Sequence, residues 1–254
     1  KKNYCEINGV GLNGFKYKKN LILNAGNSGT LGRLILGLLV KSPFKIKLIG
    51  DKSLSKRDFS RVIIPLKKFG AEFFPKNKST LPILIKGSNT LKPINYYEKK
   101  GSAQCKSSIM YAALNVPGKT IIKAKKSRDH TEILFKNLNL PIKVKKEKNH
   151  DLIKLVAKKN IKPFNYNIPT DISSSAFFIV LTLLSKNSNL IIKNVNINPS
   201  RTGVIKILNK MGGKIKIKNR KMYKGEKIAD IYVKSIKFFK SINCPIKFNS
   251  SAID

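Results

Sequence analysis

The stretch NAGNSGTLGRLILGLL, residues 24–39, joins a glycine-rich polar turn directly to an apolar segment of helical period. Glycine lets the backbone approach a ligand closely, and the first N–H groups of a helix are free to bind an anion. The turn lacks the Lys-Ser/Thr pair of a P-loop and the GxGxxG spacing of a dinucleotide site. It therefore predicts an anion site of a different kind.

Arginine is rare in this chain, and four of the six arginines lie in the segments where the expected helices open or are joined to strands. Six of the 52 basic residues are arginine: Arg33, Arg57, Arg61, Arg128, Arg201 and Arg220. Arginine holds a carboxylate or phosphate with two parallel hydrogen bonds, whereas lysine supplies a point charge. Arg57 and Arg128 lie between an expected strand and an expected helix, and we interpret both as anion ligands. For Arg201, in a similar turn, a salt bridge within the loop is an equally open interpretation.

Internal repetition indicates how these turns are positioned. Three segments open with small or polar residues and continue with an amphipathic helical pattern: 28–41, 102–116 and 171–186. Each is followed by an alternating strand pattern and a second helical pattern. These second helices end at residues suited to a left-handed cap, about 70 residues apart: Gly70, Asn139 and Gly212. We predict an α/β (α+β) fold of three βαβαββ units, with a fourth opening at CPIKFNSSAID, since chance periodicity would not repeat two helices and two caps in step.

The composition is strongly basic, with a formal net charge of +39 over 254 residues, of which 41% are hydrophobic. Lysine is spread through expected strands, loops and helices alike, which favours a biased coding composition over a nucleic-acid surface. A basic nucleic-acid-binding protein stays open as an alternative of a different class. Cys5, Cys105 and Cys244 show no metal-ligand or redox spacing, so we expect reduced thiols and a cytoplasmic location.

Six ordered segments resemble the signature segments of the EPSP synthase (3-phosphoshikimate 1-carboxyvinyltransferase) family: GNSGTLGRL, GDKSLSKRDF, GSAQCKSSIMYAAL, SRDHTEIL, DISSSAFF and NPSRTGVIKILNKMGG. The resemblance implies the enolpyruvyl transferase fold, a two-domain inside-out α/β barrel with the active site between the domains. It places most of the first domain at residues 1–169 and the beginning of the second at 170–254. We therefore expect a fragment lacking repeats at both ends and inactive alone.

The resemblance also implies a reaction. The enolpyruvyl group of phosphoenolpyruvate passes to the 5-hydroxyl of shikimate 3-phosphate, a step of chorismate and aromatic amino-acid biosynthesis that requires no metal or organic cofactor. The family assigns phosphoenolpyruvate binding to Asn27, Gly29, Arg57 and Gln104. It assigns shikimate 3-phosphate binding to Ser102, Ala103, Gln104, Ser127, Arg128 and Asp254, with Asp254 also catalytic because it assists deprotonation of the 5-hydroxyl.

Other residues and partners are left more open. Asp171 could be an ordinary N-cap or a ligand, and we assign His130 no catalytic role. The expected partners are the two small-molecule substrates, with no membrane, no specific nucleic acid and a monomeric state. The sibling transferase acting on UDP-N-acetylglucosamine is an alternative. It typically uses a cysteine on a mobile loop, and none of the three cysteines lies in that context.

Overall fold

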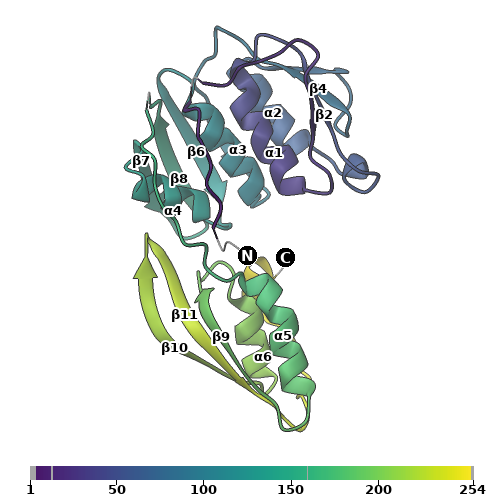
Figure 1. The fold of residues 1–254 in the computed structure, drawn as a ribbon, viewed down its shortest axis with the longest axis vertical. Coiled ribbons are helices and arrows are strands. Elements are labelled where there is room, and N and C mark those ends of the chain that lie inside the picture. The colour runs from purple at the N-terminus through teal and green to yellow at the C-terminus, as the bar shows by residue number, and fades with distance from the viewer. Residues whose placement is uncertain (1–3, 13, 159, 253–254) are drawn as a thin grey trace. The chain divides into compact units, whose positions relative to one another are not determined.

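The computed structural model describes residues 4–12, 14–158 and 160–252 and divides the chain into two compact units (Figure 1). Unit 1 comprises residues 1–126 and 138–163, and unit 2 comprises residues 127–137 and 164–254. Among the described residues, no helix combines the length and the apolar character needed to cross a bilayer. The family domain boundary expected at residue 169 stays a prediction.

The order of helices and strands repeats three times along the chain. The first repeat contains β1 (Ile22–Asn24), α1 (Gly29–Leu38), β2 (Ile46–Ile49), α2 (Ser60–Phe69), β3 (Glu72–Phe74) and β4 (Ile83–Lys86). The second contains β5 (Asn95–Glu98), α3 (Ala103–Ala113), β6 (Lys119–Lys125), α4 (His130–Asn137), β7 (Ile142–Lys146) and β8 (His150–Val156). The third contains α5 (Ile172–Leu184), β9 (Asn189–Asn196), α6 (Gly203–Lys210), β10 (Lys214–Tyr223) and β11 (Glu226–Lys234). A short helix, α7 (Asn249–Ala252), follows where the sequence predicts a fourth opening.

The three sheets share one topology. Their strand orders are β1-β2-β4-β3, β5-β6-β8-β7 and β9-β11-β10. In the first two sheets the first pair of strands is parallel and the other pairs are antiparallel. In the third, Thr170 forms a parallel bridge to Val195 of β9, at the position that the first strand occupies in the other two sheets. The predicted mixed α/β repeat is therefore confirmed.

The first helix of each repeat begins at the residue that the sequence indicates. The side chains of Ser28, Ser102 and Asp171 accept hydrogen bonds from the N–H groups three residues later, at 3.1, 3.2 and 3.0 Å. Each bond satisfies one otherwise unpaired donor of the first turn. The second helices end as predicted, because Gly70, Asn139 and Gly212 have positive φ angles of 114°, 52° and 93°.

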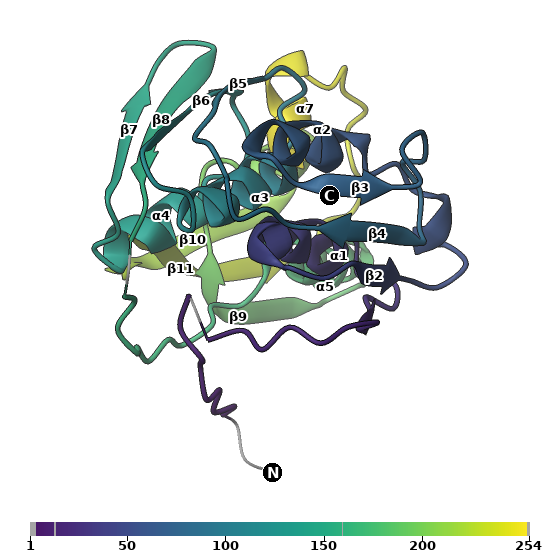
Figure 2. The same ribbon diagram turned by 90° about the horizontal axis from the view of Figure 1, so that it is seen from above.

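In unit 1, α1 and α2 both pack against α3, and Figure 2 shows these helices among their strands. The backbones of α1 and α3 meet at Gly37, where an added Cβ would lie 2.2 Å from the carbonyl oxygen of Ser108. Only glycine permits this approach, which brings the beginnings of the two helices within reach of each other.

A second contact joins α2 to α3 inside unit 1. Pro65 lies within α2 and has no N–H to donate to the carbonyl of Arg61. The Cys105 thiol of α3 donates to that carbonyl instead, with Sγ 2.8 Å from the oxygen. Burial, aided by the nearby Glu98 carboxylate, raises the pKa of Cys105 to about 12, so the thiol remains a proton donor.

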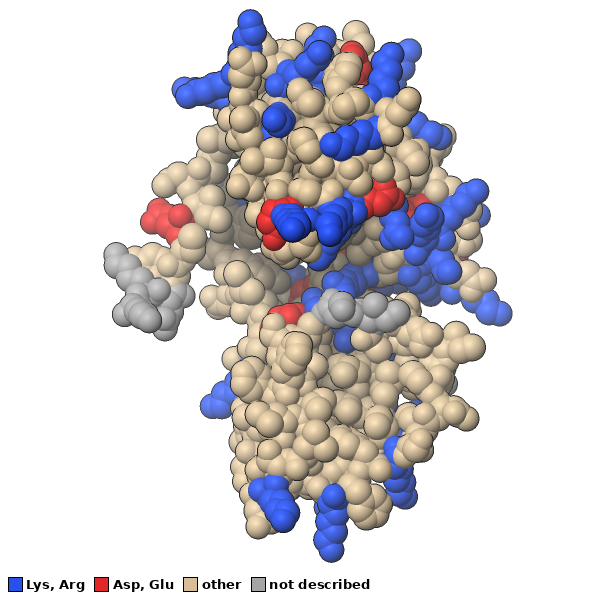
Figure 3. All heavy atoms as spheres, turned by 90° about the vertical axis from the view of Figure 1, so that its right-hand side faces the viewer, with Lys and Arg blue, Asp and Glu red and all other residues tan. Residues whose placement is uncertain are grey.

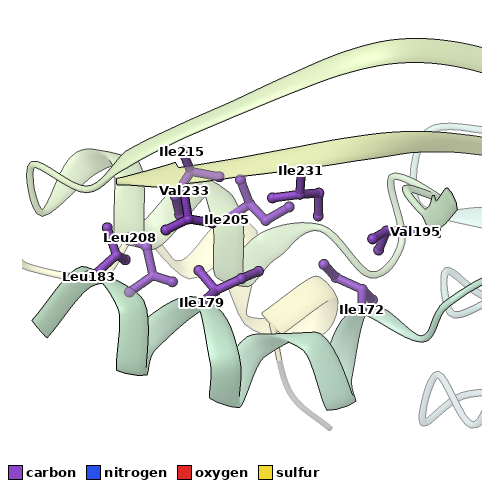
Figure 4. Packing of buried hydrophobic residues seen from close by; sticks show 9 residues of the cluster. All are labelled: Ile172, Ile179, Leu183, Val195, Ile205, Leu208, Ile215, Ile231 and Val233. Atoms are coloured by element: carbon purple, nitrogen blue, oxygen red, sulfur yellow. The ribbon is translucent and has the colours of Figure 1, made fainter. Parts of the chain in front are cut away.

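Unit 2 has its own core between the two helices and the three-stranded sheet (Figure 4). The helices and the strands both contribute to it: Ile172, Ile179, Leu183, Val195, Ile205, Leu208, Ile215, Ile231 and Val233. Helix α5 carries no charged residue, and its other face leaves Phe177, Phe178, Leu181 and Leu184 exposed. The amphipathic pattern predicted for this helix is therefore incomplete, because one apolar face is buried in the core and the opposite face is also apolar.

Candidate active site

The turn between β1 and α1 is held by short polar contacts. Gly26 has a φ of +53°, and its N–H donates to the Asn24 side chain at 2.9 Å. The Asn27 amide donates to Asp51 at 2.5 Å, and Asp51 also accepts from the Leu54 N–H at 2.7 Å. These bonds hold the pKa of Asp51 below its ordinary value. The side chains of Asn24 and Asp51 therefore hold the turn in this conformation without a ligand.

Two guanidinium groups lie beside the first residue of α1. A Cβ built at Gly29 would lie 3.0 Å from Nη1 of Arg33 and 3.3 Å from Nη1 of Arg57. The N–H groups of Gly29 and Thr30 belong to the first turn, which has no intrahelical acceptor. The two arginines and this helix beginning form a concentrated donor set for a small anion.

Gln104 connects this helix beginning to that of α3. Its Nε2 donates to Oγ1 of Thr30 at 2.9 Å, and its Oε1 accepts from Nη1 of Arg33 at 2.8 Å. The side chain thus joins residues more than 70 positions apart in the sequence. The turn at 27–29 and the helix beginning at 102–104 therefore open toward the same region of unit 1.

Positive charge is in excess in the arginine cluster, where Asp51 lies near Arg57 and Asp58 lies near Arg33 and Arg61. Burial lowers the pKa of Arg33, and the neighbouring charges of Arg57 and Arg61 lower it further. The Asp58 carboxylate lies nearby, but it accepts hydrogen bonds from the Ser60 N–H at 2.9 Å and from the Ser60 hydroxyl at 2.5 Å. Arg33 instead donates to the Asp58 carbonyl at 3.1 Å and lies over the Phe59 ring, 5.0 Å from its centroid. An external anion would relieve this repulsion.

An open cavity of about 640 Å³ lies next to this cluster. Asp51, Lys52, Ser53, Lys56 and Arg57 line it. The three basic side chains outnumber the one carboxylate, so the cavity would attract a multiply charged anion toward the α1 turn.

In unit 2, Arg201 contacts the beginning of α5. Arg201 Nη2 lies 3.0 Å from Oδ1 of Asp171 and also donates to the Ser173 hydroxyl in a short hydrogen bond. Burial alone would raise the pKa of Asp171, but the Ser174 hydrogen bonds and Arg201 outweigh it and hold that pKa low. The N-cap role of Asp171 and the loop salt bridge of Arg201 are both observed.

Arg128 lines a second cavity, of about 580 Å³, within unit 2. Its polar wall also includes Ser173, Ser200 and Arg201, and its apolar wall comes from α5, α6 and α7. Among the described atoms, the Ser127 hydroxyl is buried and has no hydrogen-bond partner. Of the two residues expected to hold one phosphate, Arg128 thus lines a cavity with both polar and apolar walls, and Ser127 precedes it in the chain.

The predicted site residues fall into three groups. The structure brings Gly29, Arg57 and Gln104 to one region of unit 1, with Asn27 in the adjoining turn. Ser102 is the N-cap of α3 and Ala103 its first residue, whereas Ser127 and Arg128 belong to unit 2. Asp254 lies outside the described residues.

Two contributors to the unit 1 cluster were missed by sequence reasoning. Arg33 and Thr30 both contact Gln104 but received no predicted role. A signal was present, because Arg33 is one of the few arginines and lies four positions after Gly29, on the same helix face.

The basic residues do not form a single stripe on the face shown in Figure 3. Lysine and arginine side chains are spread over unit 1, whereas the visible surface of unit 2 is largely uncharged. On this face, therefore, the single basic track expected of the nucleic-acid alternative is not seen.

Comparison with known proteins shows which family the chain resembles. A family model described as EPSP synthase (3-phosphoshikimate 1-carboxyvinyltransferase) matches residues 1–241. A 3-phosphoshikimate 1-carboxyvinyltransferase of Caldicellulosiruptor bescii is 44% identical over 216 residues, covering 84% of this chain and 50% of the relative. That of Vesicomyosocius okutanii is 44% identical over 250 residues, covering 98% and 56%.

A solved structure of an EPSP synthase is also similar to this chain. The EPSP synthase from Acinetobacter baumannii superposes with a TM-score of 0.81 at 38% sequence identity, covering 96% of this chain and 55% of that chain. The present chain therefore spans about half the length of the relatives that it matches.

Proposed function

Because the chain belongs to the EPSP synthase family, we propose that the protein transfers the enolpyruvyl group of phosphoenolpyruvate to the 5-hydroxyl of shikimate 3-phosphate. The products are 5-enolpyruvylshikimate 3-phosphate and phosphate. One observation carries this proposal: Gln104 joins two helix beginnings beside the guanidinium groups of Arg33 and Arg57. That arrangement suits two anionic substrates bound next to each other.

Phosphoenolpyruvate would occupy the arginine cluster of unit 1. Its carboxylate and phosphate need several donors, which Arg33, Arg57 and the α1 N–H groups can supply. The absence of a side chain at Gly29 leaves room for the ligand against these donors. The Asn27 side chain would border the same ligand from the turn.

Shikimate 3-phosphate would be held by the residues that follow the strands of the second repeat. Ser102, the Ala103 N–H and Gln104 would contact it at the beginning of α3. Ser127 and Arg128 would bind its phosphate, and the unpaired Ser127 hydroxyl supports that assignment. Asp254 would accept the proton of the 5-hydroxyl, a role that rests on the family resemblance.

The proposed reaction is an addition followed by an elimination. The 5-hydroxyl oxygen bonds to C2 of phosphoenolpyruvate, and the methylene carbon gains a proton. The tetrahedral intermediate then loses phosphate from C2 and one methyl proton, which restores the double bond. Fixed cationic donors stabilise the developing negative charge because they need no reorganisation during the reaction.

The test is phosphate release by protein expressed from its complete coding sequence. We expect release with phosphoenolpyruvate and shikimate 3-phosphate, and none when UDP-N-acetylglucosamine replaces the shikimate ester. Release only with the nucleotide sugar would identify the sibling reaction. Nucleic-acid binding that survives high salt, without phosphate release, would support the different-class alternative.

A matched pair of variants tests the site. Arg57→Lys keeps the charge but loses the second hydrogen bond, so we expect the KM for phosphoenolpyruvate to rise about 10- to 100-fold, from about 1.5–3 kcal/mol for a charged hydrogen bond. Arg220→Lys makes the same exchange on exposed β10 and should leave the KM unchanged. Equal kinetics for both variants would remove Arg57 from the site.

The proposed setting is cytoplasmic, with the protein acting as a monomer. All three cysteines are free, and Cys5 and Cys244 are exposed, as expected in a reducing compartment. Size-exclusion chromatography with light scattering would test the monomeric state.

A further inference from the structure

His130, the first residue of α4, makes a close contact with a buried carboxylate. Its Nδ1 lies 2.6 Å from Oε1 of Glu226, whose side chain is only 5% exposed. Burial alone would raise the pKa of Glu226, but its bonds with His130 and with two asparagines hold that pKa below its ordinary value. The carboxylate is thus buried, whereas the His130 side chain remains 33% exposed.

The β10–β11 hairpin brings Glu226 to this position. Gly225, in the hairpin turn, has a φ of +84°, and an added Cβ would lie 2.9 Å from Cγ2 of Ile133 in α4. The turn is therefore packed directly on α4, and Glu226 follows it as the first residue of β11. The hairpin thus fixes the beginning of a helix that lies more than 85 positions earlier in the chain.

Asn198 extends the contact to the turn that precedes α4. Its Nδ2 donates to Oδ1 of Asp129 at 2.8 Å and to Oε2 of Glu226 at 3.4 Å. Its Oδ1 accepts from the Ser200 N–H at 2.9 Å and from the Ser200 hydroxyl at 2.7 Å. One side chain therefore ties together the loop before α6, the hairpin and the α4 turn.

Arg128 lies immediately before Asp129 and two positions before His130. It lines the unit 2 cavity together with Ser200, which the same network holds. Among the described atoms, Nε2 of His130 is buried without a hydrogen-bond partner.

We propose that His130 and Glu226 are positioning residues that hold the 127–129 turn, so that Arg128 meets the phosphate of shikimate 3-phosphate in a fixed orientation. This inference rests on the function proposed above. A guanidinium held in place before binding loses less conformational freedom on binding, and the ligand gains affinity accordingly. The network acts through Arg128 and does not touch the reacting atoms.

The experiment measures the Kd of each substrate by calorimetry, and KM and kcat, on protein expressed from its complete coding sequence. In Glu226→Ala we expect the Kd for shikimate 3-phosphate to rise about tenfold, the lower end of the loss expected for a charged hydrogen bond. The Kd for phosphoenolpyruvate alone and the kcat at saturation should change by less than about twofold, as expected for sites that do not interact with the substituted residue. Glu226→Gln, which keeps the size and one acceptor, should recover part of the affinity.

A second histidine–glutamate pair provides the control. His150 Nε2 lies 2.7 Å from Oε2 of Glu147 in the β7–β8 hairpin of unit 1. Glu147→Ala should leave both affinities unchanged. If Glu226→Ala unfolds, the test uses Glu226→Gln instead. In that variant we expect hydrogen exchange of the 127–131 amides to become faster than exchange in the rest of α4.

The outcomes separate the two proposals. Failure of the unmodified protein to bind shikimate 3-phosphate would overturn the proposed function and this inference together. Binding by the unmodified protein with an unchanged Kd in both Glu226 variants would overturn only the positioning role. A parallel loss of affinity for both substrates would do the same, because it would indicate general destabilisation.

Discussion

Replacing Gln104 by glutamate would separate charge from geometry in the unit 1 site. The new carboxylate would still accept from Arg33, now as an ion pair, and could accept from the Thr30 hydroxyl. It would also place a negative charge next to the proposed phosphoenolpyruvate. For two charges about 5 Å apart at an effective dielectric constant of about 20, the repulsion is about 3 kcal/mol. We expect a higher melting temperature and an affinity for phosphoenolpyruvate lowered about 100-fold.

Calorimetric titration with phosphoenolpyruvate at low salt, together with thermal unfolding, would measure both effects. Gln104→Ala serves as the control, because it removes both hydrogen bonds without adding charge. It should lower stability by about 1–3 kcal/mol and weaken binding less than the glutamate does. The reasoning would be refuted if the folded glutamate variant bound phosphoenolpyruvate as tightly as the unmodified protein.

Three further predictions concern stability. Cys105→Ala leaves the Arg61 carbonyl without its donor and should lower the unfolding free energy by about 1–3 kcal/mol, whereas Cys105→Ser should lower it less; equal losses in urea titrations would contradict this. Because the pKa of Glu226 is lower in the folded state than in the unfolded state, its ionised carboxylate stabilises the fold. This contribution is complete above the unfolded-state pKa and is lost as the pH falls through the folded-state pKa. Glu226→Gln should therefore flatten the stability curve on the acid side of the ordinary glutamate pKa. Parallel stability curves for the variant and the unmodified protein would contradict this prediction. Asp171→Asn keeps a capping side chain but breaks the ion pair with Arg201, so we expect a loss of about 1 kcal/mol or less, with a larger loss in Asp171→Ala. Equal thermal shifts for these two variants would contradict the capping role.

The repeat and its helix boundaries were predictable from the sequence because their causes are local. Ser28 and Ser102 cap helices whose N–H groups lie three residues away, and Gly70 ends α2 in a conformation that glycine adopts without strain. The family resemblance rests on segments of the same local kind. Nothing distant along the chain is needed to make such assignments.

The meeting of distant side chains required the tertiary structure. Gln104 reaches Arg33 because Gly37 allows α1 and α3 to touch backbone to backbone. Arg201 forms an ion pair with Asp171, although a ligand role was an equally open prediction.

The sequence by itself determined where helices begin, where they end and which family the chain resembles, since each depends on a side chain and the backbone next to it. Only the tertiary structure decided which charges become neighbours. His130 and Glu226 are 96 positions apart, and their contact depends on how a hairpin turn packs against a helix. Such packing depends on the shapes of both surfaces, which no short stretch of sequence contains.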